Sequence, residues 1–158
     1  MRKDEAWAYI AVMNRSALMG GCDQAWFERN YTKDPLFDPS YLCLIWHGEL
    51  PVAAAGAWHC TIDGEEWGMV QWVGVIDKER GKGLGKVVTL AALHRLKERG
   101  FTRAMLGTHP WRVQAIATYL HLGFVPWPTA YAPQAVWDEV LRDLDEWRKG
   151  SRKMPDEA

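Results

Sequence analysis

A glycine-rich run lies between a buried strand and an amphipathic helix, and no other feature constrains the fold as much. The run reads Arg80-Gly81-Lys82-Gly83-Leu84-Gly85. Hydrophobic patterning predicts a strand over residues 69–75 before it and a helix over residues 84–99 after it. The first backbone N–H groups of a helix have no intrahelical acceptor, and the helix dipole favours negative charge there. The run therefore predicts a diphosphate site, with Arg80 and Lys82 adding positive charge.

The spacing of the glycines separates three kinds of phosphate-binding loop. A Walker A loop requires G-x-x-x-x-G-K-[ST], and the run has neither the first glycine nor a hydroxyl residue after Lys82. The dinucleotide fingerprint G-x-G-x-x-G also fails, because Gly85 comes one position early. The remaining pattern is R-x-x-G-x-G, formed by Arg80, Gly83 and Gly85. A second motif stands downstream at residues 111–124, where the sequence reads WRVQAIATYLHLGF.

Together the two motifs resemble those of the GNAT superfamily of N-acetyltransferases. The glycine-rich run is similar to the acetyl-CoA loop of that superfamily. The downstream segment resembles its N-x-x-A-x-x-x-Y-x-x-x-G-F pattern, a helix that ends at a glycine. Ala115, Tyr119, Gly123 and Phe124 match this pattern, whereas Arg112 stands in place of the asparagine. The resemblance covers residues 69–124 and is weaker towards both ends of the chain.

The resemblance implies an α/β (α+β) fold, with a mixed, mostly antiparallel central sheet, flanking helices and splayed central strands. It also implies an acetyl-CoA-dependent N-acetyltransferase that acts on a primary amine of a small molecule or peptide, without a metal ion. The thioester would lie between the strand at 69–75 and a further strand predicted at 103–107. The resemblance assigns these residues to the cofactor: Val73, Val75, Ile76, Arg80, Gly81, Lys82, Gly83, Leu84, Gly85, Lys86 and Arg112.

Tyr119 stands where this superfamily commonly has a tyrosine hydroxyl near the CoA sulfur. A phenol is a suitable acid for a departing thiolate; alternatively, Tyr119 packs in the core with its hydroxyl satisfied. Arg112 either reaches a phosphate of CoA or faces solvent on the first helical turn. The general base stays unassigned among His59, Glu65, Glu66 and His109, which also fit ordinary turn or loop positions.

The remaining sequence predicts further elements around this segment. Helices are predicted over residues 5–15, 24–30 and 134–149, with Asp23 capping the second one, and strands over residues 41–47 and 52–61. Thr108 is a candidate cap for the helix that follows Trp111. The sequence predicts one domain over residues 1–150 and a disordered tail over residues 151–158.

Composition limits the partners. The formal net charge of −1 gives no bulk attraction to nucleic acid, and no apolar run is long enough to span a bilayer. Three cysteines without CxxC spacing indicate reduced thiols in a cytoplasmic protein, and most of the ten tryptophans are expected in the core. A homodimer is left open. The competing function is an acyl-CoA-binding sensor or interaction module with little catalysis, since the loop alone fits both.

Overall fold

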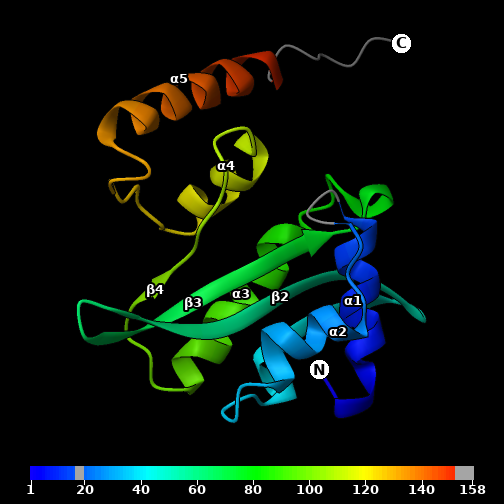
Figure 1. The fold of residues 1–158 in the computed structure, drawn as a ribbon. Coiled ribbons are helices and arrows are strands. Elements are labelled where there is room, and N and C mark those ends of the chain that lie inside the picture. Colours follow the sequence, from blue (N-terminus) through cyan, green and yellow to red (C-terminus); the bar gives the residue numbers. More distant parts are fainter. Residues whose placement is uncertain (17–19, 152–158) are drawn as a thin grey trace, which may run out of the picture. The chain divides into compact units, whose positions relative to one another are not determined.

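The computed structural model describes residues 1–16 and 20–151 (Figure 1). The chain divides into two compact units, Met1–Leu106 and Gly107–Ala158. The first unit contains the sheet, the glycine-rich run and three of the helices. The second contains the downstream motif and the C-terminal helix. Ser151, the first residue of the tail expected over residues 151–158, is the last residue of α5, and residues 152–158 lie outside the described part of the chain.

The first unit contains a four-stranded sheet in the order β1-β2-β3-β4. The β1–β2 and β2–β3 pairs are antiparallel, whereas β3 and β4 are parallel. The sheet therefore has the expected mixed, mostly antiparallel form. Its strands are β1 (Leu42–His47), β2 (Leu50–Ile62), β3 (Glu65–Val75) and β4 (Ala104–Met105).

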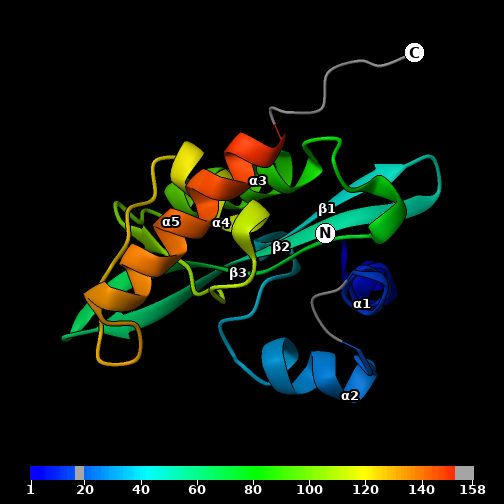
Figure 2. The same ribbon diagram turned by 90° about the horizontal axis from the view of Figure 1, so that it is seen from above.

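Helices cover both faces of this sheet (Figure 2). On one side lie α1 (Ala6–Arg15) and α2 (Gln24–Phe27), and on the other lies α3 (Leu84–Glu98). Two glycines of β3 permit close packing on each side. A Cβ at Gly74 would come within 2.9 Å of the Ser16 Oγ atom of the α1 segment, and one at Gly68 within 3.0 Å of the Leu96 Cδ1 atom of α3.

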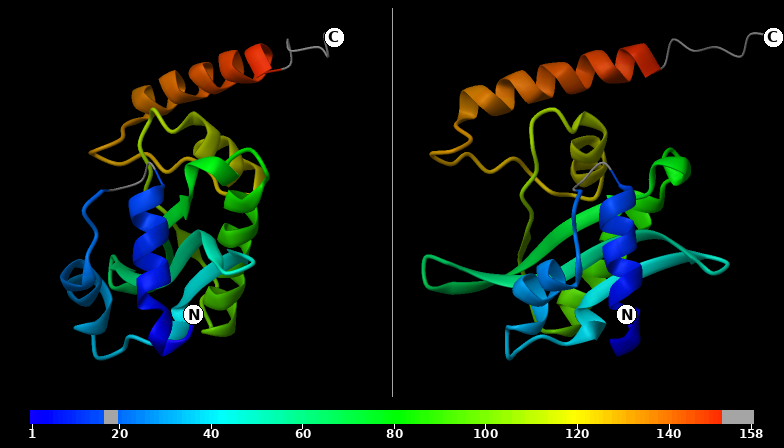
Figure 3. Two further views of the ribbon diagram at one scale, coloured as in Figure 1. Left: turned by 90° about the vertical axis from the view of Figure 1, so that its right-hand side faces the viewer. Right: turned by 45° about the vertical axis from the view of Figure 1, so that its right-hand side comes forward.

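The alanine-rich stretch of β2 is explained by this double coverage. Ala53, Ala54, Ala55 and Ala57 are all 0% exposed. A strand buried on both faces shows no alternation of apolar and polar residues, so the irregular pattern of this strand reflects its central place in the sheet. Away from this central part, the β2–β3 hairpin extends past the helices of the unit at its tip (Figure 3).

Most predicted elements are present, with shifted ends. The Asp23 cap is confirmed, because its carboxylate accepts a hydrogen bond from the Trp26 amide at 2.7 Å. The second helix continues from α2 as a π-helical turn over Glu28–Thr32. The strand expected at 69–75 begins earlier, at Glu65, and the one expected at 103–107 keeps only two residues. Three short 3₁₀ helices cover Lys3–Glu5, Pro39–Tyr41 and Asp77–Glu79.

The second unit is helical in the part that the structure describes. Its elements are α4 (Val113–His121) and α5 (Gln134–Ser151), so the expected terminal helix is confirmed. Val140 and Leu144 of α5 are 3% and 1% exposed, and Gly123 follows α4 with φ 93°. The glycine stop expected after the downstream helix is therefore confirmed.

Candidate active site

The glycine-rich run starts directly from the end of β3. Ile76 is buried and donates its backbone N–H to the Val52 carbonyl at 3.0 Å, which fixes the exit of the chain from the sheet. The 3₁₀ turn Asp77–Glu79 follows, and α3 then begins at Leu84. A Cβ at Gly85 would lie 3.8 Å from Val75 Cγ2. The loop therefore returns to the strand end, and the structure brings Val75 beside the first turn of α3.

Two glycines of the loop have backbone conformations that other residues rarely adopt. Gly81 and Gly83 have φ values of 77° and 78°, in the left-handed region. Gly83 is the N-cap of α3, and no side chain caps the helix, so helix geometry leaves the amides of its first turn directed outward. A Cβ at Gly81 or at Gly83 would have no atom within 4 Å. The space beside the loop is therefore open, as an anion site at a helix N-terminus requires.

Both cationic side chains of the glycine-rich run form ion pairs with nearby carboxylates. Arg80 Nη2 lies 2.9 Å from Asp77 Oδ1, and Lys82 Nζ lies 2.9 Å from Glu79 Oε2. The hydrogen bond from Lys82 lowers the pKa of Glu79, and His47 Nδ1 lies 3.5 Å from the same carboxylate. Sequence reasoning missed these pairs, although their spacing of three residues was a usable signal. The Arg80–Asp77 pair is exposed, and such pairs are weak, so an anionic ligand can compete with Asp77 for Arg80. The Glu79 side chain is only 14% exposed.

Strand β3 has an open edge over the residues that lead into the loop. Its pairing with β4 is limited to Gly68 opposite Ala104 and Met69 opposite Met105. Among the described residues of this unit, no strand pairs with that edge from Val70 to Val75. Val73 and Val75 are half-buried there. The β3–β4 pairing thus ends at Met69, and the edge of β3 beyond it can offer backbone groups to an extended ligand.

A β-bulge interrupts β3 along this open edge. The register with β2 shifts between Ala54 opposite Gly74 and Gly56 opposite Gln71, which leaves two residues of β3 facing one of β2. The bulged residue Trp72 has φ 53°. Bulges redirect backbone groups and side chains and are frequent beside active sites. The sequence offered no signal for this one, because tryptophan and valine both favour regular strands.

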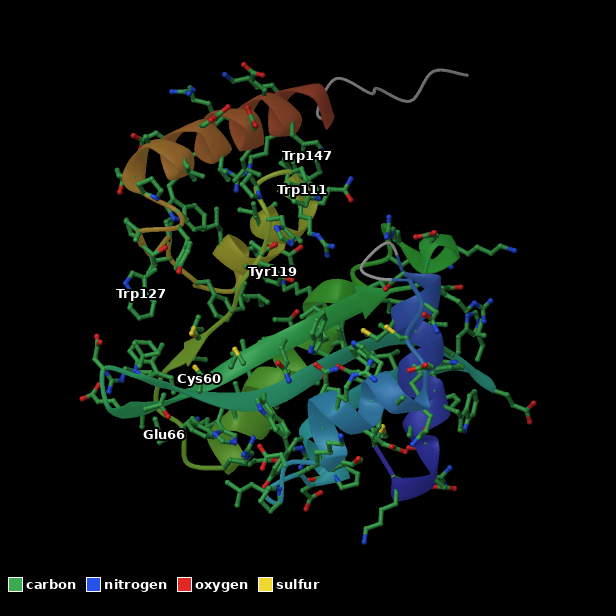
Figure 4. The ribbon with its side chains drawn as sticks, viewed as in Figure 1. Cys60, Glu66, Trp111, Tyr119, Trp127 and Trp147 are labelled. Atoms are coloured by element: carbon green, nitrogen blue, oxygen red, sulfur yellow. The ribbon has the colours of Figure 1, made fainter. Side chains whose placement is uncertain are left out.

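Tyr119 lies on α4 in the second unit, and it is half-buried (Figure 4). Its ring makes an edge contact with Phe124 at a centroid distance of 6.1 Å, and its carbonyl accepts a hydrogen bond from the Phe124 amide. Burial raises the pKa of the Tyr119 hydroxyl, and the positive charge of Arg112 partly opposes this. The phenol is therefore protonated at neutral pH and available as an acid.

Arg112 is the N-cap of α4, and it is half-buried. The prediction that Thr108 caps this helix was wrong, since α4 begins at Val113. The 109–112 segment forms a separate turn first, with the Arg112 amide donating to the His109 carbonyl at 3.0 Å. Arg112 thus has its backbone at the start of α4, and its positive charge acts on the Tyr119 hydroxyl.

The four candidate bases have partners of their own. Glu66 accepts a hydrogen bond from Thr61 Oγ1 at 2.5 Å, which lowers its pKa, and lies 3.4 Å from His59 Nδ1. Glu65 pairs with Arg103 across the hairpin end, and the His109 ring stacks on Trp111 at 4.3 Å.

The strand positions argue against the Glu66 pair as the base. Glu66 stands six residues before Trp72 on β3 (Figure 4). At ~3.3 Å per residue this is roughly 20 Å along the strand. The pair formed by His59 and Glu66 therefore belongs to the hairpin end and not to the bulge.

Residues 1–16 and 20–151 contain neither a candidate metal centre nor a membrane-spanning helix. In that part of the chain no three His, Cys, Asp or Glu side chains gather in a way that could hold a metal ion. No helix described there is long and apolar enough to cross a bilayer. The three cysteines, Cys22, Cys43 and Cys60, are free thiols.

Comparison with known proteins agrees with the resemblance found in the sequence and with the sheet. A sequence profile described as the Acetyltransferase (GNAT) family matches residues 8–124. A protein named mycothiol acetyltransferase from Nocardia farcinica is 37% identical over 93 residues, which are 57% of this chain and 31% of that protein. A protein of the same name from Thermobispora bispora is 32% identical over 133 residues, covering 80% of this chain and 44% of that protein. The chain thus spans less than half the length of these curated relatives.

The fold is also found among solved structures. An aminoglycoside N-acetyltransferase in complex with CoA superposes with a TM-score of 0.64 at 14% sequence identity, covering 82% of this chain and 88% of that chain. At this identity the likeness concerns the fold alone. The sheet and the helices on both of its faces thus occur together in other proteins.

Proposed function

The chain belongs to the acetyltransferase (GNAT) family, and on this basis we propose that it transfers the acetyl group of acetyl-CoA to a primary amine of a small molecule or peptide. The observation that carries the proposal is the uncapped start of α3 at Gly83, next to the open edge of β3. The open edge of β3 leads directly into the anion site at the start of α3, so the two features are adjacent. A diphosphate followed by an extended pantetheine arm has the matching chemistry.

We assign the cofactor diphosphate to the loop from Arg80 to Lys86. The open space beside Gly81 and Gly83 supports this assignment, as do the charges of Arg80 and Lys82. The pantetheine arm then runs along Val75 and Val73 and reaches the bulge at Trp72. A backbone amide of this bulge donates a hydrogen bond to the thioester carbonyl, where negative charge develops in the transition state.

The reaction needs a neutral amine and a proton for the leaving group. The amine nitrogen attacks the carbonyl carbon, the C–S bond breaks, and the sulfur takes a proton from the Tyr119 hydroxyl. The amine loses its extra proton to water. The Tyr119 hydroxyl is protonated when the thiolate forms, as this role requires. Since acetyl-CoA is an intracellular metabolite, the reaction takes place in the cytoplasm.

Release of free CoA thiol from acetyl-CoA, measured with a panel of primary amines, tests the proposal. The panel includes aminoglycosides, peptide amines and mycothiol-related amines, because relatives carry the name mycothiol acetyltransferase. We expect at least one amine to raise thiol release about tenfold or more above the rate without amine, with the acetylated amine seen by mass spectrometry. The sensor alternative predicts a higher melting temperature with acetyl-CoA but no thiol release with any amine.

Arg112 provides a separate test of the cofactor contacts. We assign its guanidinium to a CoA phosphate, because it is half-buried at the start of α4. Arg112→Gln removes the charge and keeps much of the length. We expect the KM for acetyl-CoA to rise about tenfold or more with kcat little changed, as for the loss of one hydrogen bond to a charged group. Steady-state kinetics with acetyl-CoA as the varied substrate measures this, and an unchanged KM would place the side chain in solvent.

A further inference from the structure

Trp72 has a backbone conformation that its neighbours must maintain. Its φ of 53° lies in the left-handed region, where a bulky residue is a genuine outlier. Asp63, the other described non-glycine residue with positive φ, lies in a tight turn that tolerates aspartate. Trp72 instead lies within a strand. Strained residues of this kind persist only where the surrounding structure fixes them, and they concentrate at functional sites.

A buried chain of polar side chains ends next to this residue. The hydroxyls of Tyr9 and Tyr31, both buried residues, lie 2.9 Å apart. The Tyr31 hydroxyl also faces the Gln71 side chain, because both lie against Gly56. Burial raises the pKa of both tyrosines, so both stay neutral. These side chains thus connect Tyr9 of α1, through Tyr31 in the turn after α2, to Gln71, the residue before Trp72.

Gly56 of β2 makes room for this chain. A Cβ there would lie 3.1 Å from Gln71 Cγ and 3.4 Å from the Tyr31 hydroxyl oxygen. Because Gly56 pairs with Gln71 at the edge of the register shift, the glycine lets the Gln71 side chain cross over β2 towards Tyr31. The bulge and the chain of polar side chains are therefore built at the same point of the sheet.

The ring of Trp72 is fixed from the same direction. It makes an edge contact with Trp26 at a centroid distance of 5.5 Å, and Trp26 in turn contacts Tyr31 at 6.1 Å. Trp26 is only 8% exposed. Tyr31 therefore supports both sides of the Gln71–Trp72 peptide, Gln71 through its hydroxyl and Trp72 through the ring of Trp26.

We propose that Tyr31 and Gln71 are positioning residues for acetyl transfer, because the packing of the Tyr31 hydroxyl against Gln71, and of its ring against Trp26, holds the Trp72 bulge in the conformation that presents its backbone to the thioester. This inference rests on the proposed function. Neither side chain needs to touch the substrate. Small displacements of reacting groups cost large factors in rate, so loosening the bulge lowers kcat and leaves the diphosphate contacts intact.

Tyr31→Phe and Tyr9→Phe form a matched pair of variants for the test. Each removes one fully buried hydroxyl and breaks the same 2.9 Å hydrogen bond, but only Tyr31→Phe also removes the hydroxyl that faces Gln71. We expect similar losses of melting temperature in both. We expect kcat to fall about tenfold in Tyr31→Phe and less than about twofold in Tyr9→Phe, with the KM for acetyl-CoA within about twofold in each. Equal losses of kcat in the two variants would overturn the proposal.

A double-mutant cycle and hydrogen exchange complete the test. Gln71→Met removes the polar end of the side chain that faces the Tyr31 hydroxyl, and the double variant with Tyr31→Phe is expected to lose no more kcat than the worse single variant. Amide exchange at Trp72 and Val73 is expected to accelerate in Tyr31→Phe relative to Tyr9→Phe. Additive losses, or equal exchange in the two tyrosine variants, would contradict the proposal. Amide exchange can be measured whether or not the protein is active. A chain that shows no acetyl transfer would therefore refute the proposed function, while the exchange result would still test the positioning role.

Discussion

Replacement of Tyr119 by phenylalanine is expected to lower kcat by about 10²-fold or more, the usual size of a general-acid contribution. The substitution removes the hydroxyl and leaves the ring, so the edge contact with Phe124 and the fold of α4 should persist. The loss should appear in kcat and not in the KM for acetyl-CoA, because the proton is needed only as charge develops on sulfur. Single-turnover kinetics with a saturating amine measures the chemical step directly.

The same chain offers a control for this substitution. Tyr131 is fully exposed, so Tyr131→Phe removes a hydroxyl without touching a buried site and should leave kcat unchanged. The raised pKa of Tyr119 adds a pH criterion. Because the protonated phenol is the active form, its titration limits the rate only at a pH above the ordinary tyrosine range. A Tyr119→Phe variant with turnover within about twofold of wild type would instead assign the residue to core packing.

The glycine-rich run shows which parts of a site a sequence can predict. The strand, turn and helix around it follow from local patterning. The ends of the predicted helix agree with α3 to within one residue, whereas β3 begins at Glu65, before the predicted start. The positive φ values of Gly81 and Gly83 are also a local property, because glycine is the residue that adopts them freely. The sequence therefore predicted the diphosphate loop in some detail, and its role stays a proposal.

The bulge at Trp72 depends instead on contacts between distant segments. Tyr9, Tyr31 and Gln71 are far apart in sequence, and nothing in their local patterns indicates that they meet in the core. Tryptophan favours strands, so local propensity predicts a regular strand here. The packing of α1 and α2 against the sheet overrides that propensity.

The start of α4 illustrates the same limit at smaller scale. Pro110 and Thr108 look like a helix start and its cap, yet the chain makes a turn through His109 before α4 begins at Val113. The stacking of His109 on Trp111 accompanies this turn. Sequence patterns therefore located α4 correctly but could not give its first residue, because turn and helix compete for the same few residues.

Substitution of Gly83 by valine is expected to abolish the stabilisation of the protein by acetyl-CoA. For wild type, a ligand at a hundredfold excess over its Kd contributes about 2.7 kcal/mol, which corresponds to roughly 5–10 °C in Tm for a chain of this size. A valine side chain at Gly83 would fill the open space beside the loop. Thermal unfolding with and without acetyl-CoA measures the difference between the two proteins.

Gly100 supplies the control, because backbone strain alone also destabilises a Gly83 variant. Gly83 precedes α3 with φ 78°, Gly100 follows the same helix with φ 89°, and a Cβ at either would have no atom within 4 Å. Valine in the left-handed region costs about 1–2 kcal/mol or more at each position, so both variants should unfold at similar, lower temperatures without ligand. Only Gly100→Val should keep the full acetyl-CoA shift. If a folded Gly83→Val protein kept that shift as well, the diphosphate could not lie at this loop, and the assignment of the cofactor to the start of α3 would fail.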